Sequence, residues 1–192
     1  MNNEIVKIIF LYEKVLFPHC TINVYLKHSS FSKGLKKGDK ILAFPIKNLF
    51  NILLIKMRVA TLAEITDIES DNEKIILHLK GIVRSRIKKF KGIHEVFFEI
   101  INSKIDNSDQ ELLKELRKKT QELVFLINVQ ESDRLIELMN FLFELNQITD
   151  FIANYFILDY KLKINLLNNT DTKRRSNKLL IKLDQIIKKM GK

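Results

Sequence analysis

Short apolar runs separated by turn-forming residues fill the first half of the chain. The runs are rich in Val, Ile, Phe and Tyr, and several alternate apolar with polar positions, which is typical of strands. The pattern predicts strands at residues 5–11, 21–27, 40–46, 52–57, 59–68, 74–80, 82–90 and 95–102, and one short helix within 29–37. Residues 70–73 are interpreted as a hairpin turn, and Gly81 as a break between two strands.

The apolar period becomes helical after residue 106. Ser108 and Glu111 have the spacing of a capping box, and a stripe of apolar residues from Leu112 to Ile127 follows them. Further helices are predicted to start at Ser132, at Thr149 and after Asp159, and a last one spans about 172–190. The order predicts an α+β protein, with a β-rich subdomain at 1–105 and an α-helical subdomain at 106–192.

Composition narrows the class of protein. The 192 residues carry a formal net charge of +10, but Lys supplies 26 of the 33 basic residues, and phosphate or base recognition favours Arg. The single cysteine, Cys20, excludes an intrachain disulfide. No apolar run approaches the length of a membrane helix, and the N-terminus lacks the features of a signal peptide, so we expect a cytoplasmic protein with no membrane partner.

Motifs that carry chemistry are missing from the sequence. It contains no phosphate-binding loop, no dinucleotide fingerprint and no His-Glu-x-x-His, and its four histidines are scattered without ligand spacing. His19 and Cys20 are neighbours on a predicted strand edge, where adjacent side chains point to opposite faces. We therefore expect no catalytic residue, no metal site and no cofactor; an enzyme with an unrecognised site is the least favoured alternative.

Three blocks of the first half resemble a known family. Residues 15–26 read Val-Leu-Phe-Pro-His-Cys-Thr-Ile-Asn-Val-Tyr-Leu, and residues 59–65 read Val-Ala-Thr-Leu-Ala-Glu-Ile. Residues 81–87 read Gly-Ile-Val-Arg-Ser-Arg-Ile, and the helical half follows in matching order from about residue 148. In this order the blocks resemble the N-terminal domain of Lon proteases, over roughly residues 5–190.

The sequence departs from that family's pattern at three places. Asn23 stands where the family usually has Pro, and Ala60 where it has Gly. The loop after the third strand, usually long and charged in the family, is the short apolar stretch 45–55. This stretch is interpreted either as a core strand or as an exposed apolar edge.

The resemblance implies a fold and a function. The implied fold is a PUA-like β pseudobarrel followed by an α-helical bundle. Because Lon proteases carry ATPase and Ser-Lys protease modules that these 192 residues lack, we expect a free-standing, non-catalytic module that binds protein substrates. The expected partners are unfolded or client proteins and a separate Lon protease.

Two surfaces are candidates for binding. An apolar surface would capture polypeptide segments; its candidate residues are Phe44, Leu49, Phe50, Leu53, Tyr25 and Phe31. The alternative function is RNA or DNA binding by a PUA-like domain. Its candidate residues are the basic side chains of 84–91, namely Arg84, Arg86, Lys88, Lys89 and Lys91.

Overall fold

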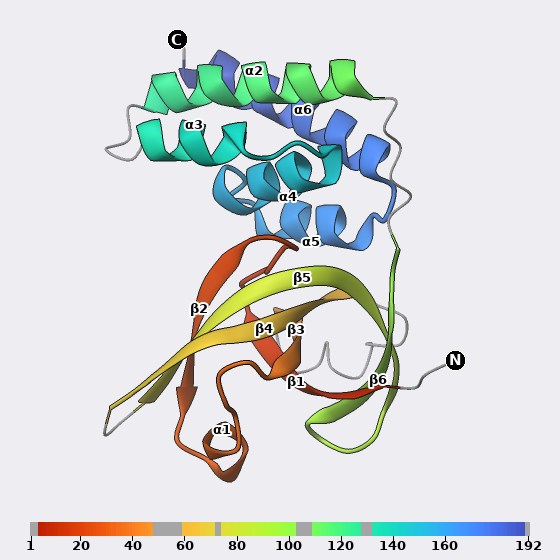
Figure 1. Ribbon diagram of the computed structural model, residues 1–192. Coiled ribbons are helices and arrows are strands. Elements are labelled where there is room, and N and C mark those ends of the chain that lie inside the picture. The colour runs from red at the N-terminus through yellow and green to blue at the C-terminus, as the bar shows by residue number, and fades with distance from the viewer. Residues whose placement is uncertain (1–3, 48–58, 72–73, 103–108, 128–131, 191–192) are drawn as a thin grey trace. The chain divides into compact units, whose positions relative to one another are not determined.

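The protein combines a β-sheet with helices, as the computed structural model in Figure 1 shows. The structure describes residues 4–47, 59–71, 74–102, 109–127 and 132–190. The strands are β1 (Ile5–Tyr12), β2 (Thr21–Lys27), β3 (Lys40–Ile46), β4 (Val59–Ser70), β5 (Lys74–Phe90) and β6 (Glu95–Ile100). The helices are α1 (Ser30–Lys33), α2 (Gln110–Ile127), α3 (Ser132–Asn140), α4 (Leu145–Tyr155), α5 (Tyr160–Asn168) and α6 (Thr172–Met190).

The chain divides into two compact units. Residues 1–102 and 159–168 form the first, here called the β unit, and residues 103–158 and 169–192 form the second, the helical unit. Helix α5 therefore groups with the strands, although it lies far along the sequence. The division at 105/106 stays a prediction from the sequence.

The described strands of the β unit form a six-stranded sheet in the order β2-β5-β4-β3-β1-β6. An additional pairing of β5 with β6 closes five of these strands into a ring, and β2 stays outside the ring, paired with β5. Only β1 and β3 run parallel among the described pairings. This closure confirms the expected α+β fold with an N-terminal pseudobarrel.

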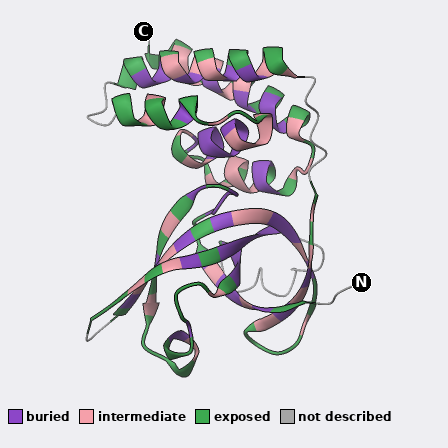
Figure 2. Ribbon diagram, in the orientation of Figure 1, coloured by how far each residue is buried: buried purple, intermediate pink, exposed green. Residues whose placement is uncertain are grey.

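Alternating side chains fill the interior of the ring. The cluster contains Val6, Ile8, Leu42, Phe44, Ile46, Ala60, Leu62, Ile87, Val96 and Phe98. Phe10 meets Phe44 edge-on, with ring centroids 6.4 Å apart, a geometry that aromatic pairs prefer. Buried positions recur at every second residue in the first half of β5, which is the period-two pattern of the sequence, whereas the first five residues of β4 are all buried; Figure 2 shows both strands coloured by burial.

The expected break at Gly81 is wrong, because β5 continues through it as one strand of 17 residues. The backbone of the segment before β2 crosses β5 at this glycine: the His19 N–H donates to the Gly81 carbonyl, and the Gly81 N–H donates to the Cys20 carbonyl, both at 2.9 Å. A Cβ at position 81 would overlap the carbonyl oxygen of Phe17. The glycine is present for close backbone approach.

The helical unit packs α2, α4 and α6 against one another, with α3 against α2. Figure 1 shows α2 and α6 side by side. Its core is made of apolar residues one helical turn apart: Leu113, Leu116, Leu123, Val124, Met139, Ile148, Ile152, Leu179 and Leu183. Helix α4 begins at Leu145, earlier than the predicted Thr149. The predicted strand 52–57 lies outside the described residues.

Among the described helices, none has both the length and the apolar character required to cross a bilayer.

Candidate functional site

The apolar candidates from the sequence lie in different environments. Phe44 is 1% exposed and belongs to the core of the ring, so its assignment to a binding surface is wrong. The reason is that both faces of β3 are buried, which a short apolar run does not show in advance. Leu49, Phe50 and Leu53 lie outside the described residues.

Two aromatic candidates are accessible to different extents. Tyr25 on β2 is 56% exposed, and the ammonium groups of Lys14 and Lys74 each lie 5.5 Å from its ring centroid. Phe31 in α1 is partly buried and stacks on His94, with ring centroids 4.4 Å apart. Of the two, Tyr25 has the ring that is more open to a ligand.

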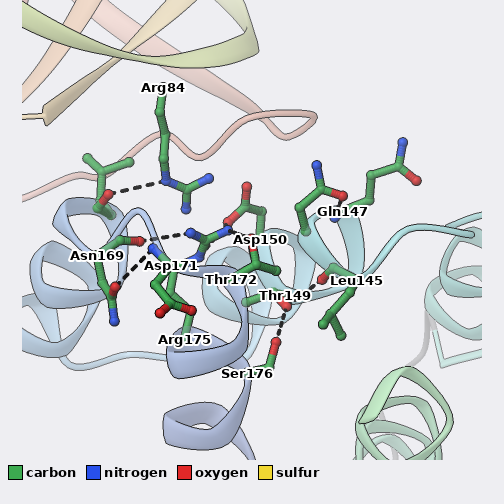
Figure 3. A network of polar contacts seen from close by, with 12 residues as sticks. Arg84, Leu145, Gln147, Thr149, Asp150, Asn169, Asp171, Thr172, Arg175 and Ser176 are labelled. Atoms are coloured by element: carbon green, nitrogen blue, oxygen red, sulfur yellow. Dashed lines mark hydrogen bonds and ion pairs between the residues drawn. The ribbon is translucent and has the colours of Figure 1, made fainter. Parts of the chain in front are cut away.

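The basic run of β5 does not form a uniform cationic surface. Arg84 is 2% exposed, and its Nε donates to the carbonyl of Leu167 at 3.2 Å, as the upper part of Figure 3 shows. Its assignment to a surface patch is wrong, because the bulges of the β4–β5 pairing break the simple alternation of faces. The guanidinium also lies over the Phe17 ring, 6.0 Å from its centroid.

The other basic residues of this run differ in their partners. Arg86 and Lys88 both contact the carboxylate of Glu99, at 3.0 and 2.7 Å. The hydrogen bond from Lys88, with that from Arg86, lowers the pKa of Glu99 against an opposing effect of desolvation. Lys91 pairs loosely with Glu95 at 3.8 Å, and Lys89 is exposed. Acidic neighbours therefore offset much of the charge that a phosphate backbone would need.

The residues that resemble the family's motifs meet around the segment before β2. Phe17 is fully buried, its carbonyl lies against Gly81, and its ring lies beneath Arg84. The buried hydroxyl of Thr61 donates to the Leu16 carbonyl at 2.6 Å. Each contact ties an irregular backbone segment to the sheet, so these motif residues support the fold and do not line a binding surface.

A buried polar cluster holds the helical unit together at α4 and α6. Arg175 is fully buried; its Nη1 donates to the Asn169 carbonyl at 2.8 Å, and its Nε lies 3.9 Å from the Asp150 carboxylate. Next to this pair, the hydroxyls of Thr149 and Ser176 are 2.9 Å apart. Figure 3 shows these side chains between the two helices. The pairing explains how a charged residue is accommodated in a core.

Near the strand that follows Phe17, Lys163 of α5 is half-buried. Desolvation lowers the pKa of its ammonium group, while the nearby Cys20 has the opposite effect. Cys20 itself is buried. His19, beside it, is exposed and has a φ of 64°, a left-handed conformation at the turn into β2. Among the described residues no group of three or more metal-ligating side chains gathers.

The sequence interpretation missed a set of exposed apolar residues in the helical unit, here called the α2–α3 apolar residues. They are Phe125, Leu126, Ile127, Leu138, Phe141 and Phe143. Phe141 and Phe143 are 66% and 72% exposed, since α3 ends at Asn140 instead of continuing through them. The sequence does contain a sign of this exposure, because the stretch has more apolar residues than one helical stripe can bury. Figure 2 shows many exposed positions on α2 and α3.

The family model that matches this chain and two solved structures similar to it are Lon substrate-binding or N-terminal domains. The family model of the ATP-dependent protease La (LON) substrate-binding domain matches residues 5–185. The structure resembles the N-terminal domain of Mycobacterium avium complex Lon protease, with a TM-score of 0.75 and 15% identity, covering 94% of this chain and 98% of that one. It also resembles a Lon N-terminal domain protein from Xanthomonas campestris, with a TM-score of 0.58 and 15% identity, covering 93% and 98%. The search of curated proteins found no match.

Proposed function

We propose, from the premise that this chain belongs to the family of the ATP-dependent protease La (LON) substrate-binding domain, that it binds unfolded polypeptides through the α2–α3 apolar residues. The observation that carries the proposal is the exposure of these six side chains between residues 125 and 143. Phe141 and Phe143 lie beside Arg117 of α2, and Phe125, Leu126 and Ile127 lie at the end of the same helix. Large exposed apolar groups that gather on a structure typically mark an interaction site. Unfolded proteins supply the matching chemistry, because they expose the apolar segments that folded proteins bury.

The binding free energy that these apolar side chains can supply is adequate for reversible capture of a polypeptide. Burying one Phe side chain contributes about 1.5–3 kcal/mol, and about 1.4 kcal/mol changes a dissociation constant tenfold. Phe141 and Phe143 are exposed on either side of Leu142, whose carbonyl accepts a hydrogen bond from Arg117 of α2 at 2.6 Å. This bond holds the segment after α3 against α2, so the two rings are presented by a fixed backbone.

The test is binding of an unfolded probe. Fluorescein-labelled casein is titrated with the wild type and with the double variant Phe141→Asp/Phe143→Asp, and anisotropy is recorded. Loss of two apolar contacts is expected to weaken binding at least about tenfold. Ile93→Asp is the matched control, because Ile93 is also highly exposed but belongs to the β unit. Equal binding by the double variant, with an unchanged circular dichroism spectrum, contradicts the proposal.

We further propose that the chain performs no chemistry itself and presents its clients to an ATP-dependent protease. The support is the family, whose model describes a substrate-binding domain. The measurement is the rate at which a purified Lon protease degrades casein with and without this chain. A change in rate that disappears in the Phe141→Asp/Phe143→Asp variant supports the link. An unchanged rate at saturating chain contradicts it.

Nucleic-acid binding is not favoured. Arg84 is buried, and Arg86 and Lys88 share the carboxylate of Glu99. A phosphate-binding surface needs basic side chains that face the ligand, and its affinity falls steeply with salt. Single-stranded RNA is added as a competitor to the complex of the chain with labelled casein, and we expect the anisotropy to stay unchanged.

A further inference from the structure

The backbone of β2 has one edge that the described strands do not use. The Cys20 carbonyl accepts from Gly81 of β5, while the Asn23 carbonyl accepts from Lys14 Nζ at 3.2 Å and the Lys27 carbonyl from Ser32 Oγ at 3.0 Å. In an antiparallel ladder, the N–H and C=O of one residue point to the same side. The odd-numbered residues of β2 therefore direct their backbone groups away from β5.

This edge is the open end of the sheet. In the described part of the chain β2 pairs with β5 alone and stands last in the strand order, whereas the five strands of the ring are paired on both sides. Figure 1 shows β2 at the margin of the strands. An open edge is a template for an added strand. The seven residues of β2 are long enough to pair with a short extended segment.

The side chains along the edge are basic around one aromatic ring. Thr21, Asn23, Tyr25 and Lys27 share the exposed face of β2, and Lys27 and Tyr25 lie opposite Lys74 and Ile76 of β5. Lys14 and Lys74 both approach the Tyr25 ring, and within the described residues neither makes an ion pair. The two ammonium groups concentrate positive charge beside the ring, and an anionic group nearby would neutralise it.

Two of the described carboxylates near Tyr25 are engaged elsewhere. Glu69 of β4 bonds His78 at 2.7 Å, and an oxygen of the Asp71 carboxylate accepts from the backbone N–H of Lys74 at 2.8 Å. Glu13 precedes Lys14 and is exposed. Among the described residues, the ammonium groups of Lys14 and Lys74 thus keep their positive charge beside Tyr25 without an ion pair.

We propose that the outer edge of β2 binds an extended acidic polypeptide segment, which adds a strand next to β2 in place of the side-chain bonds to the Asn23 and Lys27 carbonyls and brings carboxylates near Lys14 and Lys74. Lysine on an edge strand protects against pairing with a second copy of the same edge, because two copies would bring their lysines together. The same lysines attract a strand of opposite charge. The inference rests on the proposed function only in that the ligand is a polypeptide; it uses a separate surface.

The probe is a labelled, capped peptide of sequence Glu-Val-Glu-Phe-Glu-Val-Glu, titrated into the full chain at low salt. Lys14→Glu and Lys74→Glu are expected to weaken binding at least about fivefold each, through reversed charge. Lys89→Glu is the matched control, with the same charge change near the other end of β5 and an expected effect below about twofold. Lys14→Gln and Tyr25→Thr keep the test valid if charge reversal perturbs the fold.

Backbone pairing is tested separately from charge. A peptide that is N-methylated at alternate residues lacks the backbone N–H groups that would donate to β2, and we expect it not to bind. Hydrogen exchange is expected to slow at the outward amides of β2 when the unmodified peptide is bound. Equal binding of the N-methylated peptide, or displacement by single-stranded RNA, overturns the proposal in favour of plain charge attraction.

The two proposals fail independently. If casein binds and the acidic peptide does not, the edge inference is wrong and the proposed function stands. If the peptide binds normally to Phe141→Asp/Phe143→Asp while casein binding by the wild type is absent, the proposed function is wrong and the edge inference stands.

Discussion

The β unit and the helical unit expose different chemical groups on their surfaces. Among the described residues, five large apolar side chains are exposed in the β unit and ten in the helical unit, six of these between residues 125 and 143. A closed ring buries one face of every strand and uses both edges, whereas a helix in a bundle buries only a stripe. The helical unit therefore offers apolar contact, and the β unit offers the backbone edge of β2.

Both units also bury an arginine, and they satisfy it differently. In the β unit, Arg84 donates to the carbonyl of Leu167, the last turn of α5, where a helix leaves acceptors unused. In the helical unit, Arg175 likewise donates to a backbone carbonyl, that of Asn169, and its Nε also lies 3.9 Å from the carboxylate of Asp150. Both units therefore bond their buried arginine to a backbone carbonyl, and the helical unit adds a buried charge pair.

Replacing Asp150 is expected to damage the helical unit most. Asp150→Leu leaves the guanidinium of Arg175 without its carboxylate in a fully buried site, a change that typically destabilises by about 3–5 kcal/mol. Chemical denaturation followed by circular dichroism measures the loss, and hydrogen exchange is expected to rise in α4 and α6.

The double variant Asp150→Leu/Arg175→Met sharpens this test. Apolar residues of similar volume need no partner, so the pair is expected to be more stable than the single variant. Asp184→Ala is the surface control, because the Asp184 contact with Lys119 is exposed to solvent. If the single and double variants lose the same stability, the charge pair is not what holds α4 to α6.

Gly81→Ala is expected to have the next largest effect, now in the β unit. The added Cβ would meet the carbonyl of Phe17, a backbone group that cannot rotate away, and overpacking of this kind costs about 3 kcal/mol. Gly34→Ala is the control, since a Cβ there has ordinary contacts, none closer than 3.5 Å. A Gly81→Ala protein as stable as the control would show that the crossing segment adapts, and the contrast between the units would weaken.

The sequence predicted the elements well because they depend on local patterns. Strands at 21–27 and 40–46 and the helix at 172–190 match their observed bounds, since periodicity, turns and caps are properties of neighbouring residues. The predicted break at Gly81 was wrong because this glycine is required by a contact that is not local. What requires a glycine there is the carbonyl of Phe17, which is distant in sequence and invisible to a local pattern.

The candidate site was harder to predict, because exposure depends on distant partners. Phe44 and Tyr25 both sit on strands, yet only the strand order decides that one fills the ring and the other faces solvent beside an open edge. The sequence pattern placed Arg84 on a basic face, but its partner is the Leu167 carbonyl of α5, which lies far along the chain. The exposure of Phe141 and Phe143 likewise depends on where α3 ends.

Two buried threonines give a smaller and closely matched comparison. Thr61→Val removes the hydroxyl that donates to the Leu16 carbonyl in an irregular segment, and leaving a buried acceptor unpaired costs about 1–3 kcal/mol. Thr120→Val removes a bond to the Leu116 carbonyl, which lies within α2 and has the helix backbone as a partner. Denaturation midpoints are expected to fall clearly for the first variant and little for the second. Equal losses would contradict the view that the β unit depends more on tied backbone segments.

Glu99→Gln gives the smallest effect and one with a defined pH dependence. The contacts with Lys88 and Arg86 lower the pKa of Glu99 below its ordinary value of 4.5, so its charged form is favoured by folding. Its stabilising contribution is therefore fully present above pH 4.5 and declines as the pH falls below that value. We expect the denaturation midpoint of the wild type to exceed that of Glu99→Gln at neutral pH, and the gap to narrow in acid and in high salt. A gap that stays constant through acid pH would mean that the three side chains are not coupled, and Arg86 and Lys88 would then be more open to an anionic ligand than their contacts with Glu99 indicate.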